Sequence, residues 1–399
     1  MNVLFVTSDR VSPQSGGIAR ATYLLADGFV DEGIKSISAY LHQNESIHSA
    51  ATNVFEQDVH VKDEDHTRQY STILTSYDVD FVIVQGGSAE MNQELLYIRE
   101  SINSQSRKVP LFLAFHSMPG YELYFLDWFI LIRKIFSKAW KEYCKQFLLQ
   151  IMMLMNKKLL QKQLYQKYHI PYQTADKIIL LSPSYVEDYN MLARGIDRSK
   201  ILSIPNMLTF PIEGKISFDK GKEVLIVARM DERSKRIKLA LRIWGSISHK
   251  ILEQGWKLTI VGDGEDLTYY KEYVEKHNMK NVSFEGRQNP LPYYQRADIF
   301  MMTSALEGWP MTLMEAMQNG CVPIVFDSFK AVYDIVDGNS GIIVPNNDVE
   351  TYIRELERLM RDDDYRKRLA KNALKDCQRF SKDRIVGQWF ELFNSYNHN

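Results

Sequence analysis

Short runs of apolar and β-branched residues alternate with helical patterns along the chain, and this alternation restricts the fold more than any other feature. In the first half, such runs occur at Val3–Thr7, Asp80–Val84, Leu111–Ala114 and Lys177–Leu181, and a helical pattern spans residues 19–30. Turn residues follow each run. Short buried strands separated by helices indicate a parallel sheet with helices on both faces.

The second half repeats this pattern from the beginning. It contains five further strand candidates, at Val224–Ala228, Leu258–Val261, Val282–Phe284, Ile299–Met302 and Val322–Phe326. Residues 205–221 carry proline and glycine without a helical period, which is typical of an interdomain linker. We therefore expect two α/β domains, residues 1–208 and 209–384. The aromatic, amphipathic segment 385–399 should form a final helix.

Bulk properties exclude several classes of protein. A chain of 399 residues is too long for one compact core and comfortable for two domains. The formal net charge of −1 argues against a general affinity for nucleic acid. Three widely spaced cysteines predict reduced thiols in a cytoplasmic protein. Because no apolar run is long enough to cross a bilayer, and the N-terminus lacks a signal-peptide pattern, any membrane contact should be peripheral.

The most informative segment is Ser304–Gly320, SALEGWPMTLMEAMQNG, which directly follows the strand candidate Ile299–Met302. Pro310 suits the first turn of a helix, and Gly320 suits its C-terminal end. Backbone N–H groups at the start of this helix, together with its dipole, would bind a diphosphate. Glu307 and Glu315 flank that position, and carboxylates accept hydrogen bonds from sugar hydroxyls.

The E-x7-E pattern of Glu307 and Glu315 within this longer match resembles the signature of retaining GT-B glycosyltransferases of family 4. The resemblance implies two Rossmann-like domains with parallel sheets facing an interdomain cleft, and a final helix that packs back onto the N-terminal domain. It also implies that Glu307 binds hydroxyls of the donor sugar and that Glu315 binds the ribose. The adjoining donor-binding residues would be Gly308, Trp309, Pro310, Met311 and Thr312.

Two cations follow the strand candidate Val224–Ala228. Arg229 and Lys235 would lie at the carboxyl end of a parallel strand, where such sheets bind ligands. The resemblance assigns both to the donor diphosphate, whose developing charge fixed cations would stabilise. The neighbouring charges of Arg233, Arg236 and Lys238 are interpreted as solvated.

Other landmarks occur in the order that the family shows. Gly262 belongs to a glycine turn after the second C-terminal strand, and Arg287 matches a stretch whose backbone meets the nucleobase. Gly16 and Gly17 resemble the family's N-terminal Gly-Gly loop, where backbone can approach a phosphate or the acceptor. His116 follows the strand candidate Leu111–Ala114 and matches an active-site histidine close to the reacting sugar.

We predict no metal and no cofactor. Asp78 and Asp80 spell the D-x-D motif of another glycosyltransferase class, but they precede a strand candidate and have no companion ligands. Lys and Arg side chains with a helix dipole can supply the electrostatic stabilisation that a metal would give.

Residues 121–169 are helical in period and rich in aromatic residues, with nine Lys or Arg against three Asp or Glu. Trp128, Phe129, Lys134, Lys138, Trp140 and Lys141 illustrate the mixture. One interpretation is an acceptor-side region that rests on anionic lipid. The other is a helical hairpin that packs on the N-terminal domain with its lysines solvated.

These expectations describe a cytoplasmic transferase that moves a hexose from a nucleotide-sugar donor to a glycan or lipid-linked acceptor of the cell envelope, such as capsule, O-antigen or exopolysaccharide. A UDP-sugar is the first choice of donor and GDP-mannose the second. Two alternatives remain open. A nucleotide-sugar epimerase would share the architecture, and a non-catalytic accessory subunit would keep the fold without the chemistry.

Overall fold

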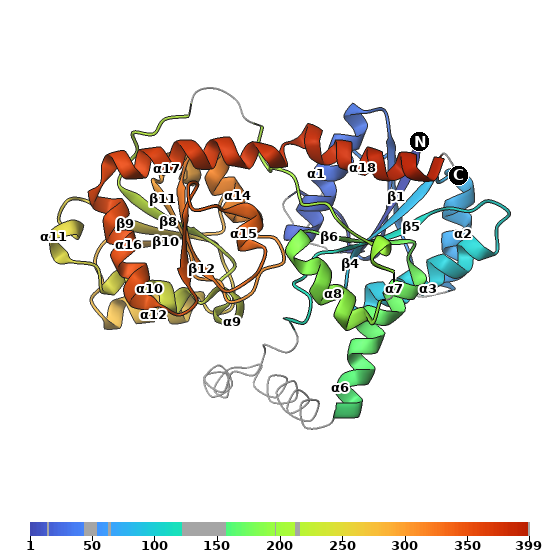
Figure 1. Ribbon diagram of the computed structural model, residues 1–399, viewed down its shortest axis with the longest axis horizontal. Coiled ribbons are helices and arrows are strands. Elements are labelled where there is room, and N and C mark those ends of the chain that lie inside the picture. The colour runs from blue at the N-terminus through green and yellow to red at the C-terminus, as the bar shows by residue number, and fades with distance from the viewer. Residues whose placement is uncertain are drawn as a thin grey trace. The chain divides into compact units, whose positions relative to one another are not determined.

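The computed structural model describes residues 1–13, 16–43, 54–62, 65–121, 157–195, 197–211 and 216–397. These residues form two compact units (Figure 1). The N-terminal unit contains the described residues up to Met207 and the segment from Phe380 onward, and the C-terminal unit contains Leu208–Arg379. Each unit is built around one parallel sheet. The parallel α/β architecture expected from the sequence is confirmed.

The N-terminal sheet has the strand order β3-β2-β1-β4-β5-β6-β7. Its strands are β1 (Asn2–Asp9), β2 (Lys35–His42), β3 (Gln57–His60), β4 (Phe81–Gly86), β5 (Leu111–Phe115), β6 (Lys177–Leu180) and β7 (Ile201–Ser203). The helices are α1 (Gly17–Asp31), α2 (His66–Ser76), α3 (Ala89–Asn103), α6 (Lys157–Leu164), α7 (Ile170–Thr174), α8 (Val186–Ala193) and α18 (Lys382–Asn397), with a π-helical turn at Tyr165–His169.

The central strands of this sheet are those that the sequence predicted. All residues of β4 and β5 are buried, which explains their continuous apolar character. By contrast, β2, β3 and β7 were not predicted. Of these, β3 is a polar edge strand and β7 has only three residues. The chain adds β2 and β3 on one side of β1 and β4 onward on the other. The order therefore reverses between β1 and β4, the position at which open α/β sheets bind ligands.

Helix α18 completes the core of the N-terminal unit although it comes from the end of the chain. The ring of Phe393 stacks on Phe81 with 4.5 Å between centroids and meets Phe29 of α1 at 5.6 Å. Gly28 lets the two helices approach, because a Cβ at that position would lie 2.6 Å from Val386. At the start of α18, the ammonium of Lys382 forms ion pairs with Asp27 and Asp31 of α1.

The C-terminal sheet has the order β10-β9-β8-β11-β12-β13, which reverses between β8 and β11. Its strands are β8 (Glu223–Val227), β9 (Lys257–Val261), β10 (Val282–Gly286), β11 (Ile299–Met302), β12 (Val322–Asp327) and β13 (Ile342–Pro345). The helices are α9 (Glu232–Lys235), α10 (Ile237–Gly245), α11 (His249–Leu252), α12 (Leu267–Lys276), α13 (Leu291–Arg296), α14 (Met311–Gln318), α15 (Val332–Ile335), α16 (Val349–Arg361) and α17 (Asp363–Asp376).

Both faces of this second sheet are covered. Alternate strand residues such as Ile226, Ile260 and Met301 share a core with α10, α12 and α16. On the other face, α13 contacts β8, and α14 contacts β11 and β12. All five strand candidates of the second half correspond to strands, β8 to β12. Strand β13, which the sequence did not predict, is a short edge strand after a turn.

The aromatic and basic side chains singled out between residues 121 and 156, from Trp128 to Lys141, lie outside the described residues. Neither interpretation of that region is therefore tested. Within the described part of the chain, no helix combines the length and apolarity that a membrane span requires.

The packing of α18 predicts the effect of truncating its central aromatic residue. Phe393→Ala should lower the free energy of unfolding of the N-terminal unit by about 3–5 kcal/mol, because a fully buried ring leaves a cavity. Hydrogen exchange during urea titration should show lost protection in β1, β4 and β5. Glu391→Ala, at an exposed position of the same helix, is the matched control and should change little. Equal effects of the two variants would contradict the packing described here.

Candidate active site

The predicted donor-site residues of the C-terminal unit gather at the carboxyl ends of β8 and β11. These two strands pair in parallel, and the strand order reverses between them. Arg229 and Lys235 follow β8, and Glu307 follows β11. Parallel pairing thus brings together residues more than 70 positions apart, at the place where ligands bind to open α/β sheets.

Lys235 and Glu307 are in direct contact. The ammonium of Lys235, the last residue of α9, donates to Oε1 of Glu307 at 2.6 Å. The side chains are 21% and 11% exposed, so the pair is shielded from most of the solvent without being sealed from it. Both charges are held in place, as the binding of a charged, hydroxyl-bearing ligand requires.

Arg229 lies nearby in sequence but is much more exposed. Its guanidinium donates to Oδ2 of Asp231 at 3.2 Å, and 72% of its side chain is accessible. Asp231 caps α9 by accepting from the backbone N–H of Arg233 and from the hydroxyl of Ser234. Although burial acts to raise it, these hydrogen bonds and the charge of Arg229 hold the pKa of Asp231 below its ordinary value.

Helix α14 begins immediately after the Glu307 loop. Pro310 occupies the N-cap position, one residue earlier than the sequence suggested, and Met311 and Thr312 form the first turn. Trp309 is buried, and its indole N–H donates to Sδ of Met314 at 3.0 Å. The helix ends before Gly320, whose positive φ of 68° favours glycine. The loop that contains Gly308 is therefore anchored by Glu307 on one side and by Trp309 on the other.

Glu315, on the inner side of α14, is fully buried. One carboxylate oxygen accepts from the hydroxyl of Thr209 at 2.7 Å, and the other accepts from the hydroxyl of Tyr294 at 2.9 Å. A ribose could bind this carboxylate only by replacing one of these two donors or by sharing an oxygen with it. The ribose contact therefore stays a prediction, and the structure adds a second role in anchoring residue 209.

The glycine turn after β9 is explained by close packing. A Cβ at Gly262 would lie 1.9 Å from the carbonyl oxygen of Ala228, and one at Gly264 would lie 2.6 Å from that of Met230. These glycines bring the turn against the β8–α9 connection that carries Arg229. Arg287, one residue beyond β10, has an exposed side chain.

In the N-terminal unit, the predicted residues follow β1 and β5. Gly16 and Gly17 start α1, and a Cβ at either position would meet no atom within 4 Å. Packing in the structure therefore does not require glycine at either position. His116 directly follows β5, and its Nε2 lies within hydrogen-bond distance of Oε1 of Gln85 at the end of β4. Burial lowers the pKa of His116 to about 4.

Comparison with known proteins identifies the C-terminal part of the chain. Residues 211–376 match the family model described as glycosyl transferases group 1. That segment is similar to the group 1 glycosyltransferases. The amylovoran biosynthesis glycosyltransferase AmsD of Erwinia amylovora is 28% identical over 231 residues, 56% of this chain and 63% of AmsD. A Campylobacter jejuni N-acetylgalactosaminyltransferase that acts on a diphospho-undecaprenol glycan is 28% identical over 227 residues, 56% of this chain and 61% of that protein.

Solved structures resemble the whole chain. HepE of Anabaena in complex with UDP superimposes with a TM-score of 0.73 at 16% identity, covering 99% of this chain and 100% of HepE. The lipopolysaccharide galactosyltransferase WaaB gives 0.68 at 18% identity, with coverage of 99% and 100%. At such identities the likeness concerns the fold, and it confirms the predicted GT-B fold. The chain spans about three-fifths of the length of the first two curated relatives.

Arg236 is a residue of the C-terminal unit whose role the sequence did not reveal. It was expected to be a solvated loop charge, and that expectation is wrong. Its guanidinium donates to the carbonyl oxygens of Thr303 and Ser304 at 2.6 and 2.8 Å, and to the side-chain oxygens of Asn346 and Asn347. It thus joins the end of β11 to the loop after β13. Nothing in one sequence distinguishes it from the basic residues beside it.

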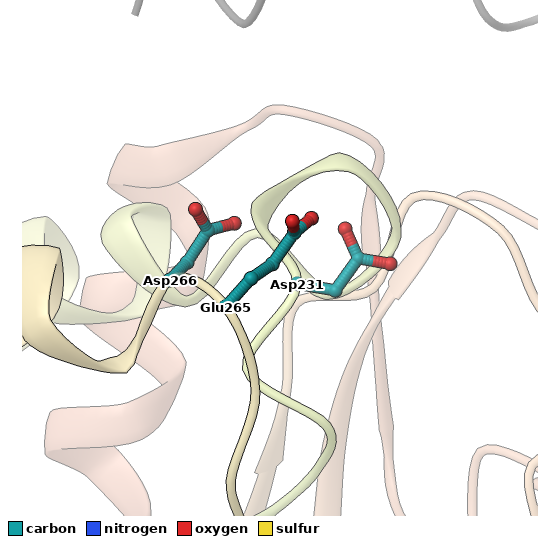
Figure 2. Close-up of side chains that lie close together, drawn as sticks. All are labelled: Asp231, Glu265 and Asp266. Carbon is teal, nitrogen blue, oxygen red and sulfur yellow. The ribbon is translucent and has the colours of Figure 1, made fainter. Parts of the chain in front are cut away.

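Three carboxylates of the same domain lie close together. Figure 2 shows Asp231, Glu265 and Asp266, each of which has one carboxylate oxygen within 4.8 Å of one oxygen of each of the other two. Asp266 accepts from the backbone N–H of Glu232 at 2.8 Å, and Asp231 caps α9 as described above. The positions of two of the three carboxylates, Asp231 and Asp266, are thus explained by hydrogen bonds that fix the start of α9.

The D-x-D sequence, Asp78 and Asp80, precedes β4 and so lies at the edge of the N-terminal sheet opposite to the carboxyl ends of its strands. Arg107 pairs with both Asp78 and Asp80, and Asp80 also accepts from the backbone N–H of Asn2 at 2.7 Å. These contacts tie the start of β4 to β1 and to the segment after α3.

The hydrogen bonds of Arg236 can be tested by measuring stability. Arg236→Met should lower the free energy of unfolding of the C-terminal unit by about 3 kcal/mol, because it leaves the Thr303 and Ser304 carbonyls without a charged donor. Arg242→Met, at an exposed position of α10, serves as the control for loss of a positive charge. Urea denaturation measures both, and hydrogen exchange should rise in residues 303–310 of the first variant alone. Indistinguishable midpoints would refute the anchoring role.

Proposed function

We propose that this chain is a retaining, metal-independent glycosyltransferase that transfers a hexose from a nucleotide-diphosphate sugar to a glycan or lipid-linked acceptor. The observation that carries the proposal is the contact between Lys235 and Glu307 at the carboxyl ends of β8 and β11. A cation and a carboxylate side by side, next to the start of α14, suit a ligand that is part phosphate and part sugar.

Different groups of the site can bind the diphosphate and the sugar of one donor molecule. When a diphosphate enters, its oxygens can replace Glu307 as the partner of Lys235, because both are anionic oxygens that accept from an ammonium. Glu307 is then available to accept hydrogen bonds from sugar hydroxyls. Arg229, with 72% of its side chain exposed, can fold over the same phosphates. The first N–H groups of α14 add donors at the positive end of the helix dipole.

The reaction proposed for these groups replaces one bond at the anomeric carbon by another on the same face. The bond from that carbon to the β-phosphate oxygen breaks, and its electron pair leaves with the nucleoside diphosphate. The acceptor hydroxyl forms the new bond and gives its proton to the departing phosphate. Lys235 and Arg229 stabilise the charge that develops on the leaving group. No side-chain nucleophile is required on the far face of the sugar.

UDP-sugars are the donors that the comparisons favour. HepE is known in complex with UDP-glucose, and the pneumococcal O-GlcNAc transferase GtfA in complex with UDP and GlcNAc. The relatives AmsD and the C. jejuni transferase carry names that refer to exopolysaccharide and lipid-linked glycan synthesis. We therefore propose cell-envelope polysaccharide assembly at the cytoplasmic side of the membrane as the setting.

The first test concerns Glu307. Glu307→Ala should reduce transfer by about 100-fold or more, because it removes an acceptor for hydroxyls of the donor sugar, while the fold is retained. Glu307→Gln keeps the shape and should lose most of the activity as well. Glu272→Ala on exposed α12 is the control. Release of nucleoside diphosphate from a mixture of UDP- and GDP-sugars, with bacterial lipid extract as acceptor source, provides the assay. An active Glu307→Ala enzyme would sink the assignment.

The second test identifies the nucleotide. Thermal unfolding is followed with UDP, GDP and ADP and their common sugar conjugates, in EDTA without added metal. Stabilisation by the uracil series is expected, amounting to about 2.7 kcal/mol when the ligand is at 100 times its dissociation constant. Lys235→Ala should abolish the shift. If EDTA removes it, the metal-independent part of the proposal fails, and if no nucleotide gives a shift, a non-catalytic accessory protein becomes the better description.

A further inference from the structure

Gln85 and His116 form a pair at the carboxyl edge of the N-terminal sheet. Gln85 lies near the end of β4 and is 3% exposed, and His116 directly follows the neighbouring strand β5. The two strands pair in parallel with Gly86 opposite Phe115, and the backbone N–H of His116 donates to the Gly86 carbonyl oxygen at 3.0 Å. This ladder brings the imidazole Nε2 to the side-chain oxygen of Gln85.

The surroundings of the pair are almost entirely apolar. Both side chains line a small cavity of ≈ 20 Å³, together with residues of α1, β6, α18 and the segment before Met207. His116 is the one ionisable side chain among the residues that line it. Among the described residues that line the cavity none carries a charge, and desolvation lowers the pKa of His116 to about 4. The imidazole is neutral at the pH of a cell.

A neutral imidazole can carry its proton on either nitrogen, and its hydrogen-bond partner decides which. A side-chain carbonyl oxygen can only accept, so Oε1 of Gln85 requires a proton on Nε2. The second nitrogen, Nδ1, then carries a lone pair. A carboxylate in place of the amide would also accept from Nε2, but its charge would favour the imidazolium form, which has no lone pair to offer.

We propose that Gln85 is a positioning residue that holds His116 as the neutral, Nε2-protonated imidazole, so that Nδ1 accepts a hydrogen bond from a hydroxyl of the substrate. The inference rests on the proposed function and on the sequence-based prediction that His116 lies close to the reacting sugar. It assigns His116 the work of a hydrogen-bond acceptor, not that of a base that takes up a proton. A histidine that stays uncharged also leaves the cations of the donor site as the partners of the diphosphate.

The first experiment measures the protonation state directly. The full chain, labelled with ¹⁵N-histidine, is studied by NMR across pH 5–8, and His116→Asn assigns the resonances. The wild type should show His116 with a protonated Nε2 and an unprotonated Nδ1 throughout this range. In Gln85→Leu the ¹⁵N shifts of the two nitrogens should move towards each other, as exchange between tautomers becomes possible. Gln85→Glu should raise the pKa of His116 by about two units.

A control separates this effect from general damage to the N-terminal unit. Asn92→Leu removes another buried amide of the same unit, which donates to the Lys167 carbonyl oxygen at 3.1 Å. Its His116 resonances should match those of the wild type. Two results would overturn the inference: an Nδ1-protonated His116 in the wild type, or an unchanged tautomer in Gln85→Leu. The first would mean that the amide nitrogen of Gln85, and not its oxygen, faces the ring.

The second experiment connects the pair to turnover. With the transfer assay described above, Gln85→Leu should lose about tenfold in kcat/KM at all pH values, the effect of one hydrogen bond. Gln85→Glu should approach wild-type activity at pH 8 and lose it towards pH 5, as His116 becomes charged, whereas the wild type and Asn92→Leu stay flat. A flat profile for Gln85→Glu, in spite of a raised pKa, would refute the acceptor role of Nδ1.

The role of Gln85 and the role of His116 in turnover can be tested separately. If the NMR results are as expected but His116→Asn turns over at the wild-type rate, His116 does not belong to the reaction, and the predicted contact of His116 with the sugar falls while the roles of Lys235 and Glu307 stand. If His116→Asn is inactive while Gln85→Leu keeps both its tautomer and its rate, the proposed function stands and the role of Gln85 falls.

Discussion

Parallel strand pairing with a reversal of strand order is the constraint on which both candidate sites depend. In each sheet, two neighbouring strands send their connections in opposite directions, β1 and β4 in one unit and β8 and β11 in the other. The loops that leave these strands cannot cover the edge between them, which creates a place for a ligand. Lys235 meets Glu307 at one of these edges. Gly16, at the start of α1, and Gln85, near the end of β4, belong to the other.

The edge of the C-terminal sheet is held together by buried polar contacts. Arg236 has a left-handed backbone conformation, with φ of 50° and ψ of 44°, which costs a non-glycine residue about 1–2 kcal/mol. Its charged hydrogen bonds to the Thr303 and Ser304 carbonyls, each worth a comparable amount, offset that cost. The turn between α9 and α10 is thus set by contacts with β11. The position of Lys235, one residue earlier, follows from it.

Much of this could be predicted from the sequence because the relevant signals are local. Buried parallel strands are short and apolar, so β4, β5 and β8–β12 were found, and the Glu307–Glu315 segment has a recognisable order of residues around a helix start. The polar strand β3 and the three-residue β7 have no such signal, since their stability comes from pairing at a sheet edge. Arg236 and Gln85 could not be found either, because their roles depend on partners 67 and 31 positions away.

Glu315 shows why a motif does not fix a role by itself. The family resemblance implies a ribose ligand, yet in the folded chain its two oxygens accept from Thr209 and Tyr294. Three residues after Glu315 on α14, Gln318 exchanges hydrogen bonds with the backbone of Phe210. One side of α14 therefore holds residues 209 and 210, the beginning of the C-terminal unit. A nucleotide that binds Glu315 must replace Thr209 or Tyr294 or share an oxygen with one of them, so donor binding and the anchoring of this segment use the same carboxylate.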